Sequence, residues 1–170
     1  MGRRIRRKIR LLSTVQRVSK AEVIIEGKSY SSIGSGLLVF ICIEESDTSI
    51  VVRKMIDKII NFKILDGSNG IASEAIKDSE EDILIVSQFT LAAITSKGNK
   101  PSFHKSAKPE KAKLLYDEFV NEFTKIYKRV EQGRFGASME IALVNNCLLY
   151  TSPSPRDVEE SRFAGWGLKK

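Results

Sequence analysis

The sequence contains few of the residues that metal, disulfide or triad chemistry requires. Its 170 residues include two cysteines, Cys42 and Cys147, and one histidine, His104. No Cys/His cluster has the spacing of metal ligands, so we expect neither a metal site nor a cofactor. Two cysteines fit a reduced, cytoplasmic setting, and Cys42 lies in an apolar run where a buried thiol is expected. His104 has no obvious serine and acid partners in the sequence, which argues against a Ser-His-Asp triad.

Long apolar runs are also absent. No stretch approaches the length of a membrane span, and the N-terminus lacks the apolar segment and cleavage site of a secretory signal. A membrane partner is therefore not expected. A hydrophobic share of 42% in 170 residues is enough for one buried core, so the sequence predicts a single folded domain.

The excess of positive charge is confined to the two ends of the chain. The formal net charge is +7, and residues 1–10 alone hold six Arg and Lys and no acid. Residues 151–170 hold four basic and three acidic residues, and the residues between these segments hold 18 of each sign. The central part is thus neutral. Charge gives no reason to expect DNA as a partner, and any RNA contact must be local.

Periodicity in the central part predicts more strands than helices, and therefore an α/β fold in which helices pack on β-sheets. The expected strands are 14–25, 28–33, 37–43, 61–65, 83–86 and a region 130–144 that Gly133 and Gly136 interrupt. Turns are expected at 26–27 and 34–36. One helix should follow Asp47 as its N-cap, and a second should run from Pro109 to Val130.

Polar side chains follow the strand 83–86 at the point where it ends. The next five residues are Ser87, Gln88, Phe89, Thr90 and Leu91. They present two hydroxyls and an amide where the backbone leaves the core, and Gly98 lets the following loop fold back over them. The segment is therefore either a functional site at a strand end or an ordinary polar turn.

Together with the loop Lys97–Phe103, the segment Ser87–Leu91 resembles the signature of the D-aminoacyl-tRNA deacylases. Three further blocks agree with that family in order and spacing: Val15–Ala21, Gly34–Val39 and Gly133–Met139. The resemblance runs from about Thr14 to Asn146. It implies a homodimer with a three-layer α/β/β fold that has mostly antiparallel sheets and two main helices.

The activity that the resemblance implies is hydrolysis of the ester joining a D-amino acid, or glycine, to the 3′-terminal adenosine of tRNA, as proofreading in translation. The implied machinery is backbone N–H groups, polar side chains and the substrate's own ribose hydroxyl. Thr90 is expected to polarise water or the ester, with Ser87 and Gln88 as catalytic neighbours. The implied substrate-binding residues are Phe89, Gly98, Pro101, Phe103, Phe135, Gly136, Ala137, Met139 and Arg17.

The sequence departs from the family's pattern after Asn146. Family members carry a Gly-Pro pair with a cis peptide bond there, and its carbonyls exclude L-amino acids from the partner subunit's pocket. Cys147 and Leu148 take its place here, and a non-proline cis bond costs about 3 kcal/mol, so we expect no such filter. Arg17 resembles the residue that holds the pair and would have nothing to hold. An alternative function is therefore a catalytically impaired homologue that binds tRNA ends or protein.

Both ends of the chain are expected to lie outside a deacylase domain at 14–146. Residues 147–157 resemble translated sequencing adapter, and we therefore expect residues 147–170 to be a non-native or disordered tail. Residues 1–13 would be basic and amphipathic as a helix. Three interpretations of them stay open: an organellar presequence, a basic arm on tRNA phosphates, or a translated leader without a role.

Overall fold

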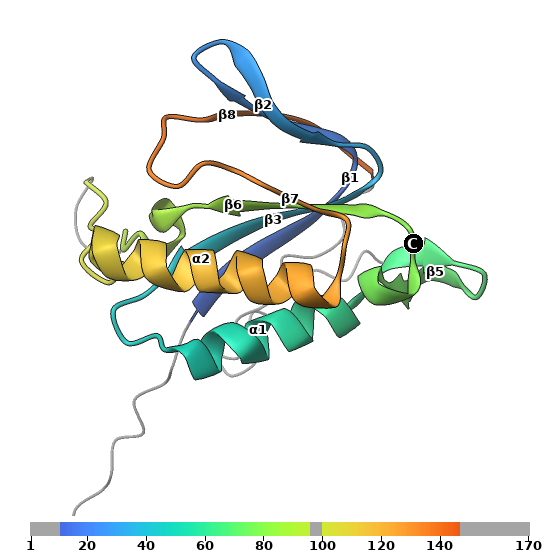
Figure 1. The fold of residues 1–170 in the computed structure, drawn as a ribbon, viewed down its shortest axis with the longest axis horizontal. Coiled ribbons are helices and arrows are strands. Elements are labelled where there is room, and N and C mark those ends of the chain that lie inside the picture. Colours follow the sequence, from blue (N-terminus) through green and yellow to red (C-terminus); the bar gives the residue numbers. More distant parts are fainter. Residues whose placement is uncertain (1–10, 96–99, 147–170) are drawn as a thin grey trace, which may run out of the picture.

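A computed structural model describes residues 11–95 and 100–146 (Figure 1). In chain order its elements are β1 (Leu11–Ile25), β2 (Lys28–Ile33), β3 (Gly36–Ile43), α1 (Ser49–Asn61), β4 (Lys63–Gly67), β5 (Gly70–Ala75), the 3-10 turn η1 (Ile76–Asp78), β6 (Asp82–Ser87), the 3-10 turn η2 (Phe89–Ala92), α2 (Pro109–Ile126), β7 (Val130–Gln132) and β8 (Glu140–Asn145). The predicted strand 28–33 and the start of the second helix at Pro109 are confirmed.

The long strand β1 connects the two β layers of the molecule. Along one edge it pairs antiparallel with β3 over Leu11–Val18 and with β2 over Ala21–Ile25. Along the other edge its second half pairs antiparallel with β8. The predicted turn between β1 and β2 is confirmed, because Glu26 and Gly27 have φ values of 52° and 72°. Two successive positive φ angles match the right-handed twist of the hairpin strands.

The centre of the larger sheet is parallel. β3 pairs with β6 up to Ile41↔Ser87, and β6 pairs in turn with β7. The pairings of β1 with β2, β3 and β8, and of β4 with β5, are antiparallel, so the mostly antiparallel arrangement is confirmed. Because β3, β6 and β7 run the same way, the loops that follow them leave the sheet at one edge.

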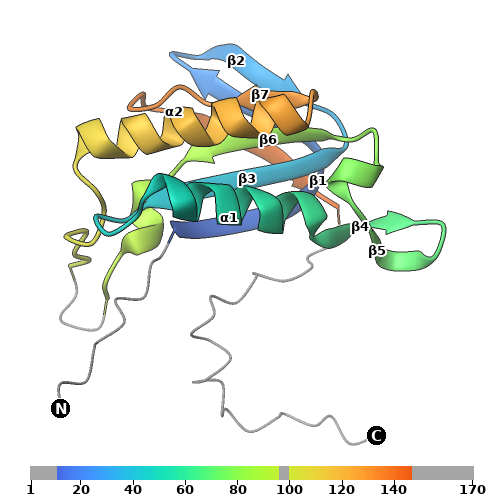
Figure 2. The ribbon, with the colours of Figure 1, turned by 60° about the horizontal axis from the view of Figure 1, so that its bottom comes forward.

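The three layers enclose two cores (Figures 1 and 2). Side chains alternate along each central strand, so Leu37 and Val39 of β3 face α1 and α2 while Leu38 faces the layer of β2 and β8. In β6, Ile83 and Ile85 join the helix-side core, whereas Leu84 and Val86 join the other. Because β3 and β6 are buried on both faces, their sequences are continuous apolar runs. The predicted α/β/β architecture is confirmed.

Two predicted helix boundaries are wrong. Asp47 does not cap α1: its Oδ2 accepts the Glu44 N–H at 2.7 Å, and the N-cap position falls on Thr48. α2 ends at Ile126, four residues before Val130, since Val130 pairs with β6.

The first strand begins earlier than predicted. Leu11 pairs with Ile43 and is buried, so Leu11–Ser13 belong to the sheet and no helix includes Leu12. The predicted strand 61–65 lies at Lys63–Gly67 and forms a hairpin with β5, which the sequence did not predict. The predicted tail 147–170 lies outside the described residues. No helix in the described ranges is long and apolar enough to cross a membrane.

Candidate active site

The candidate site lies where the three parallel strands end. The Gln88 N–H donates to the Ile41 carbonyl at 2.8 Å, which joins the end of β6 to the end of β3. The Gly133 N–H donates to the Ile85 carbonyl at 2.8 Å, which joins the end of β7 to β6. The segment Ser87–Ala92 and the loop Gly133–Met139 therefore emerge from neighbouring strands. Such an edge of an α/β sheet is where ligands commonly bind.

The predicted catalytic residues form one compact turn. Ser87 closes β6, Gln88 precedes η2, and Thr90 lies within it. The Gln88 side-chain amide donates to Thr90 Oγ1 at 2.6 Å. All three side chains are half-buried, which combines a fixed geometry with access from solvent. The structure thus brings Ser87, Gln88 and Thr90 together.

Phe89 presents an exposed ring beside this turn. Its exposed fraction is 60%, and the edge of the half-buried Phe103 ring packs against it with centroids 5.4 Å apart and planes at 75°. A bridge between Ile94 and Ser102 places Pro101 and Phe103 near the turn. Gly98, which was expected to let the loop after the turn fold back, lies outside the described residues.

The Phe89 carbonyl accepts two side-chain hydrogen bonds that sequence reasoning did not foresee. Ser106 Oγ donates at 3.1 Å, and the Cys42 thiol donates at 3.5 Å. Cys42 is buried, as expected, and is a free thiol. No local pattern could have found this contact, because Cys42, Phe89 and Ser106 meet only through the fold.

The loop Gly133–Met139, which is predicted to form the other wall of the site, packs against the cores. Phe135 is half-buried and stacks tilted on Tyr116, with centroids 5.7 Å apart. The Tyr116 hydroxyl donates to the Ile85 carbonyl at 2.9 Å, and burial raises the pKa of this phenol, so it stays protonated. Gly136 has a φ of 76°, and the Ala137 N–H donates to the Arg134 carbonyl at 3.2 Å. These contacts give the loop a defined shape.

Met139 lies half-buried against the core between the two β layers. A Cβ on Gly133 would stand 2.9 Å from the Met139 sulfur and 3.4 Å from Val86 Cγ1. The Met139 side chain therefore packs closely against Gly133 where the loop leaves β7, and a side chain at position 133 would require Met139 to shift.

Arg17 is not part of the same cluster within one subunit. It pairs with Leu37, four residues before Ile41, so it lies about 13 Å along β3 from the site edge. Its guanidinium is buried and donates to the carbonyl of Asn146 at 2.7 Å, to that of Ile64 at 3.3 Å and to Asp66 Oδ1 at 2.6 Å. Residues 147 and 148, which replace the pair that Arg17 was expected to hold, lie outside the described residues, so that expectation stays a prediction.

His104 has a serine partner that the sequence did not reveal. Ser102 Oγ lies 2.8 Å from His104 Nδ1, and both residues are exposed. This pair lies beside Phe103 in the loop that returns to the turn. In the described part of the chain, no group of three or more His, Cys, Asp or Glu residues is arranged to hold a metal ion.

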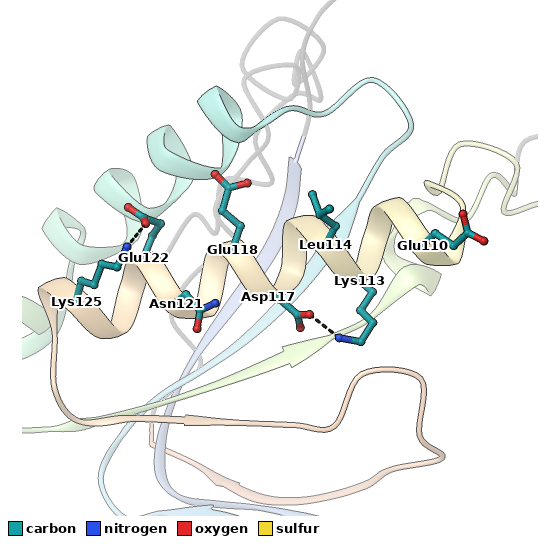
Figure 3. A pocket seen from close by; sticks show the side chains of 8 residues that line it. All are labelled: Glu110, Lys113, Leu114, Asp117, Glu118, Asn121, Glu122 and Lys125. Atoms are coloured by element: carbon teal, nitrogen blue, oxygen red, sulfur yellow. Dashed lines mark hydrogen bonds and ion pairs between the residues drawn. The ribbon is translucent and has the colours of Figure 1, made fainter.

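A hollow of about 550 Å³ on the solvent face of α2 does not include any of the predicted site residues (Figure 3). Its lining residues all come from this helix and, apart from Leu114, are charged or polar: Glu110, Lys113, Leu114, Asp117, Glu118, Asn121, Glu122 and Lys125. Lys113 pairs with Asp117 at 2.5 Å and Lys125 pairs with Glu122 at 2.6 Å. Such pairs on an exposed face are ordinary helix-surface contacts.

Comparison with known proteins relates the same residues to one family. The family model described as D-Tyr-tRNA(Tyr) deacylase matches residues 14–147. The D-aminoacyl-tRNA deacylase of Francisella tularensis subsp. novicida (strain U112) is 40% identical over 136 residues, which cover 80% of this chain and 94% of the relative. The enzyme of the same name from Bacteroides thetaiotaomicron is 44% identical over 133 residues, covering 78% of this chain and 89% of the relative.

Solved structures agree with this match. One described as "c-Myc DNA Unwinding Element Binding Protein" superposes with a TM-score of 0.75 at 36% identity, covering 79% of this chain and 91% of that one. Another, described as "Structural Analysis of a probable eukaryotic D-amino acid tRNA deacylase", has a TM-score of 0.72 at 18% identity, covering 78% and 92%. The second similarity supports the fold alone.

Proposed function

The chain belongs to the D-Tyr-tRNA(Tyr) deacylase family, and we propose that it hydrolyses the ester bond of D-aminoacyl-tRNA to release free amino acid and tRNA. The curated relatives described above carry the name of this enzyme. They favour a hydrolase over the alternative of an impaired homologue that only binds tRNA ends or protein. Removal of D-amino acids from tRNA is a chiral proofreading step in translation, and glycyl-tRNA is a further candidate substrate.

The observation that carries the proposal is the turn at the ends of the parallel strands. Ser87, Gln88 and Thr90 lie together there, an exposed aromatic ring stands beside them, and the loop Gly133–Met139 leaves the adjacent strand. Both segments lie inside the part of the chain that matches the family model. The site therefore combines polar groups that can act on an ester with a flat apolar surface for a base.

Thr90 is the residue that we assign to the reacting ester. Because the Gln88 amide donates to Thr90 Oγ1, the hydroxyl acts as acceptor toward Gln88 and keeps its own proton for donation. A hydrogen bond from this proton to the ester carbonyl, or to an attacking water, would stabilise charge that develops in the transition state. Ser87 and Gln88 are assigned to holding the turn and the hydroxyl in place.

The bond changes need no covalent enzyme intermediate. Water adds to the ester carbonyl carbon, the bond from that carbon to the ribose oxygen breaks, and the ribose oxygen takes up a proton. We assign assistance in these proton transfers to the neighbouring ribose hydroxyl of the substrate. Phe89 and Phe103 would hold the terminal adenine by stacking, which is worth about 1–3 kcal/mol per base in single-stranded nucleic acid.

The proposed assembly is a homodimer in the cytoplasm. Arg17 and Asn146 lie toward the end of β3 opposite the site of their own subunit, so any part they take at a substrate requires a second copy of the chain. The exposed Val144 on β8 offers apolar surface near this end. The free thiol of Cys42 fits a reducing compartment. Size-exclusion chromatography with light scattering would test the dimer.

Release of amino acid from charged tRNA tests the activity directly. The chain should release D-tyrosine from D-tyrosyl-tRNA well above the rate of spontaneous hydrolysis, and release from glycyl-tRNA and L-tyrosyl-tRNA should be measured beside it. A second version tests the filter: in it, Gly-Pro replaces Cys147-Leu148 and a family-like strand follows. The filter should raise the preference for D-tyrosyl-tRNA over L-tyrosyl-tRNA. Absence of D-tyrosine release from both versions would reject the proposed hydrolase.

A further inference from the structure

The Phe89 carbonyl receives two hydrogen bonds from outside its own turn. The hydroxyl of Ser106 donates at 3.1 Å from the loop that precedes α2, and the thiol of Cys42 donates at 3.5 Å from the central strand β3. Within η2 the i→i+3 pattern of a 3-10 turn already directs this oxygen toward the Ala92 N–H, and the flanking bonds run from Leu91 N–H to the Gln88 carbonyl at 3.4 Å and from Ala93 N–H to the Thr90 carbonyl at 3.0 Å. The bonds from Cys42 and Ser106 to the Phe89 carbonyl are thus additional to the backbone hydrogen bonds of the turn and the strands.

The thiol donor is buried, and the Phe89 carbonyl at 3.5 Å is nearer to its sulfur than the other acceptor, the Ile43 carbonyl at 3.9 Å. Cys42 is 1% exposed, and its thiol lies beside the Ser106 side chain and the Ala92 backbone amide. Burial raises the pKa of this thiol, so it keeps the proton that it donates. The thiol therefore contacts η2 near both ends, at the Phe89 carbonyl and at the Ala92 amide.

The hydroxyl donor is fixed by backbone pairing. Ser106 forms a β-bridge with Glu44, and its N–H donates to the Phe103 carbonyl at 3.0 Å. The next residue, Ala107, donates its N–H to the Ile43 carbonyl at 2.9 Å. The loop that carries Ser106 is therefore attached to the residues that follow Cys42 along β3. The two donors and the strand form one rigid support beneath the turn.

The anchored carbonyl determines how the turn faces the substrate. In a trans peptide unit the carbonyl and the next N–H point in opposite directions. Because the Phe89 carbonyl points toward Cys42 and Ser106, the Thr90 N–H points away from them. The Phe89 ring stands outside this support with 60% of its surface exposed. Rotation of the peptide between Phe89 and Thr90 would displace the Thr90 side chain, while the Phe89 ring would stay exposed outside the support.

We propose that Cys42 and Ser106 are positioning residues for the hydrolysis, which act by fixing the peptide between Phe89 and Thr90. They touch no substrate themselves. The proposal rests on the proposed function for its kinetic consequence, whereas the anchoring of the turn can be measured without substrate. Neither residue belongs to the segments whose resemblance to the deacylases identified the site.

Kinetics of single and double variants test the positioning role. Ser106→Ala and Cys42→Ala should each lower kcat for D-tyrosyl-tRNA about tenfold, as small misplacements at a reacting centre do. KM should stay within about twofold, because the stacking surface remains. Ser106→Thr and Cys42→Ser retain a donor and should recover most of kcat. In a Thr90→Ala background, Ser106→Ala should add little further loss, since the two changes disable the same group.

Hydrogen exchange of the residues 89–93 measures the anchor without substrate. Exchange of these amides should rise about tenfold in Ser106→Ala and Cys42→Ala, while amides of β1 and α2 stay as in the unmodified chain. Ser79→Ala is the matched control, because Ser79 Oγ donates to the Ile76 carbonyl at 3.0 Å in η1, at the other end of β6. This control should alter neither kcat nor exchange at 89–93.

The outcomes separate this proposal from the proposed function. Unchanged exchange at 89–93 in both alanine variants, or a kcat loss in the Thr90→Ala background as large as in the unmodified one, would overturn the positioning role. If the unmodified chain released no D-tyrosine, the proposed function would fail, and the exchange rates would still decide whether Cys42 and Ser106 hold the turn. A rise in exchange confined to 89–93 would support the anchor in either case.

Discussion

At the scale of single residues, one hydrogen bond determines what Thr90 offers to a substrate. The Gln88 amide occupies an acceptor position of Thr90 Oγ1, and this directs the hydroxyl proton elsewhere. The half-buried setting of both side chains keeps the pair in one geometry while the substrate side stays open.

Thr90→Ala should lower kcat for D-tyrosyl-tRNA about 10²-fold, since removal of one donor to a developing oxyanion costs about 10²–10³ in kcat. Thr90→Ser retains the hydroxyl and is the matched control, expected within about tenfold of the unmodified chain. Thermal melting should change little, because the substitution deletes one half-buried side-chain end rather than core volume. Turnover that is the same in Thr90→Ala and the unmodified chain would remove Thr90 from the mechanism.

The ion pair between Arg17 and Asp66 predicts a pH-dependent contribution to stability. The Ala72 N–H and the Arg17 guanidinium both bond Asp66 Oδ1, at 3.0 and 2.6 Å, and lower the pKa of this carboxyl below its ordinary 3.8. A lowered folded-state pKa means that the stabilisation is complete above about pH 3.8 and is lost as pH falls through the folded-state value.

Asp66→Asn should therefore lower the free energy of unfolding near neutral pH. The difference from the unmodified chain should shrink as the pH falls below about 4, because the Asp66 carboxyl then becomes protonated, first in the unfolded chain and at lower pH in the folded one. Urea unfolding at several pH values between 3 and 7 measures this difference. A difference that stays constant over the range would contradict the assigned pairing.

At the scale of elements, the sequence predicted those structures whose determinants are local. The turn at Glu26–Gly27 and the alternating or continuous apolar strands follow from residues that are adjacent in the chain. Asp47 misled because the N-cap position falls one residue later, on Thr48, and the Asp47 carboxylate bonds the Glu44 N–H where the chain leaves β3. β5 was missed because its partner is the short strand β4, and its residues carry little apolar alternation.

Gly36 and Gly27 allow a comparison of two glycine-to-alanine substitutions with different expected costs. A Cβ on Gly36 would stand 1.9 Å from the Asp82 carbonyl oxygen, where β3 passes β6, so Gly36→Ala requires the strands to separate. We expect Gly36→Ala to lower the free energy of unfolding by more than about 3 kcal/mol, a loss typical of substitutions that disrupt the core. Gly27→Ala meets no atom within 4 Å and has only a positive φ of 72° to accommodate, so it should cost about 1 kcal/mol.

Urea unfolding of both glycine variants would measure this difference. Equal losses for Gly36→Ala and Gly27→Ala would show that the contact between β3 and β6 relaxes without strain.

At the scale of the whole molecule, the sequence predicted the segments of the candidate site, and the fold supplied the contacts between them. Ser87–Thr90 was recognisable because it follows a buried strand and matches a family signature. The contact of Cys42 with Phe89 was not recognisable, because it depends on β3 and β6 being parallel neighbours. The position of Arg17 away from the turn likewise follows from strand register, and no residue pattern near Arg17 encodes it.

The basic segment at the N-terminus gives the last prediction. Residues 1–10 hold six cations and no acid, whereas β1 starts at Leu11, whose side chain is buried. A truncation should therefore end at Arg10 rather than Ser13, because removing Leu11–Ser13 also deletes three rungs of the ladder with β3. The family match begins at residue 14, so deletion of residues 2–10 should leave kcat for D-tyrosyl-tRNA unchanged within about twofold.

The dependence of KM on salt distinguishes the open interpretations of this segment. If the arm bound tRNA phosphates, its deletion would raise KM and reduce the slope of log KM against log salt by about one unit per lost contact. Deletion of residues 2–13 serves as the comparison, and it should lower the melting temperature because the β1 ladder is shortened. An unchanged salt slope in the shorter deletion, with kcat retained, would assign the cations no part in substrate binding. Loss of hydrolysis in a variant that stays folded would instead make residues 2–10 part of the catalytic complex.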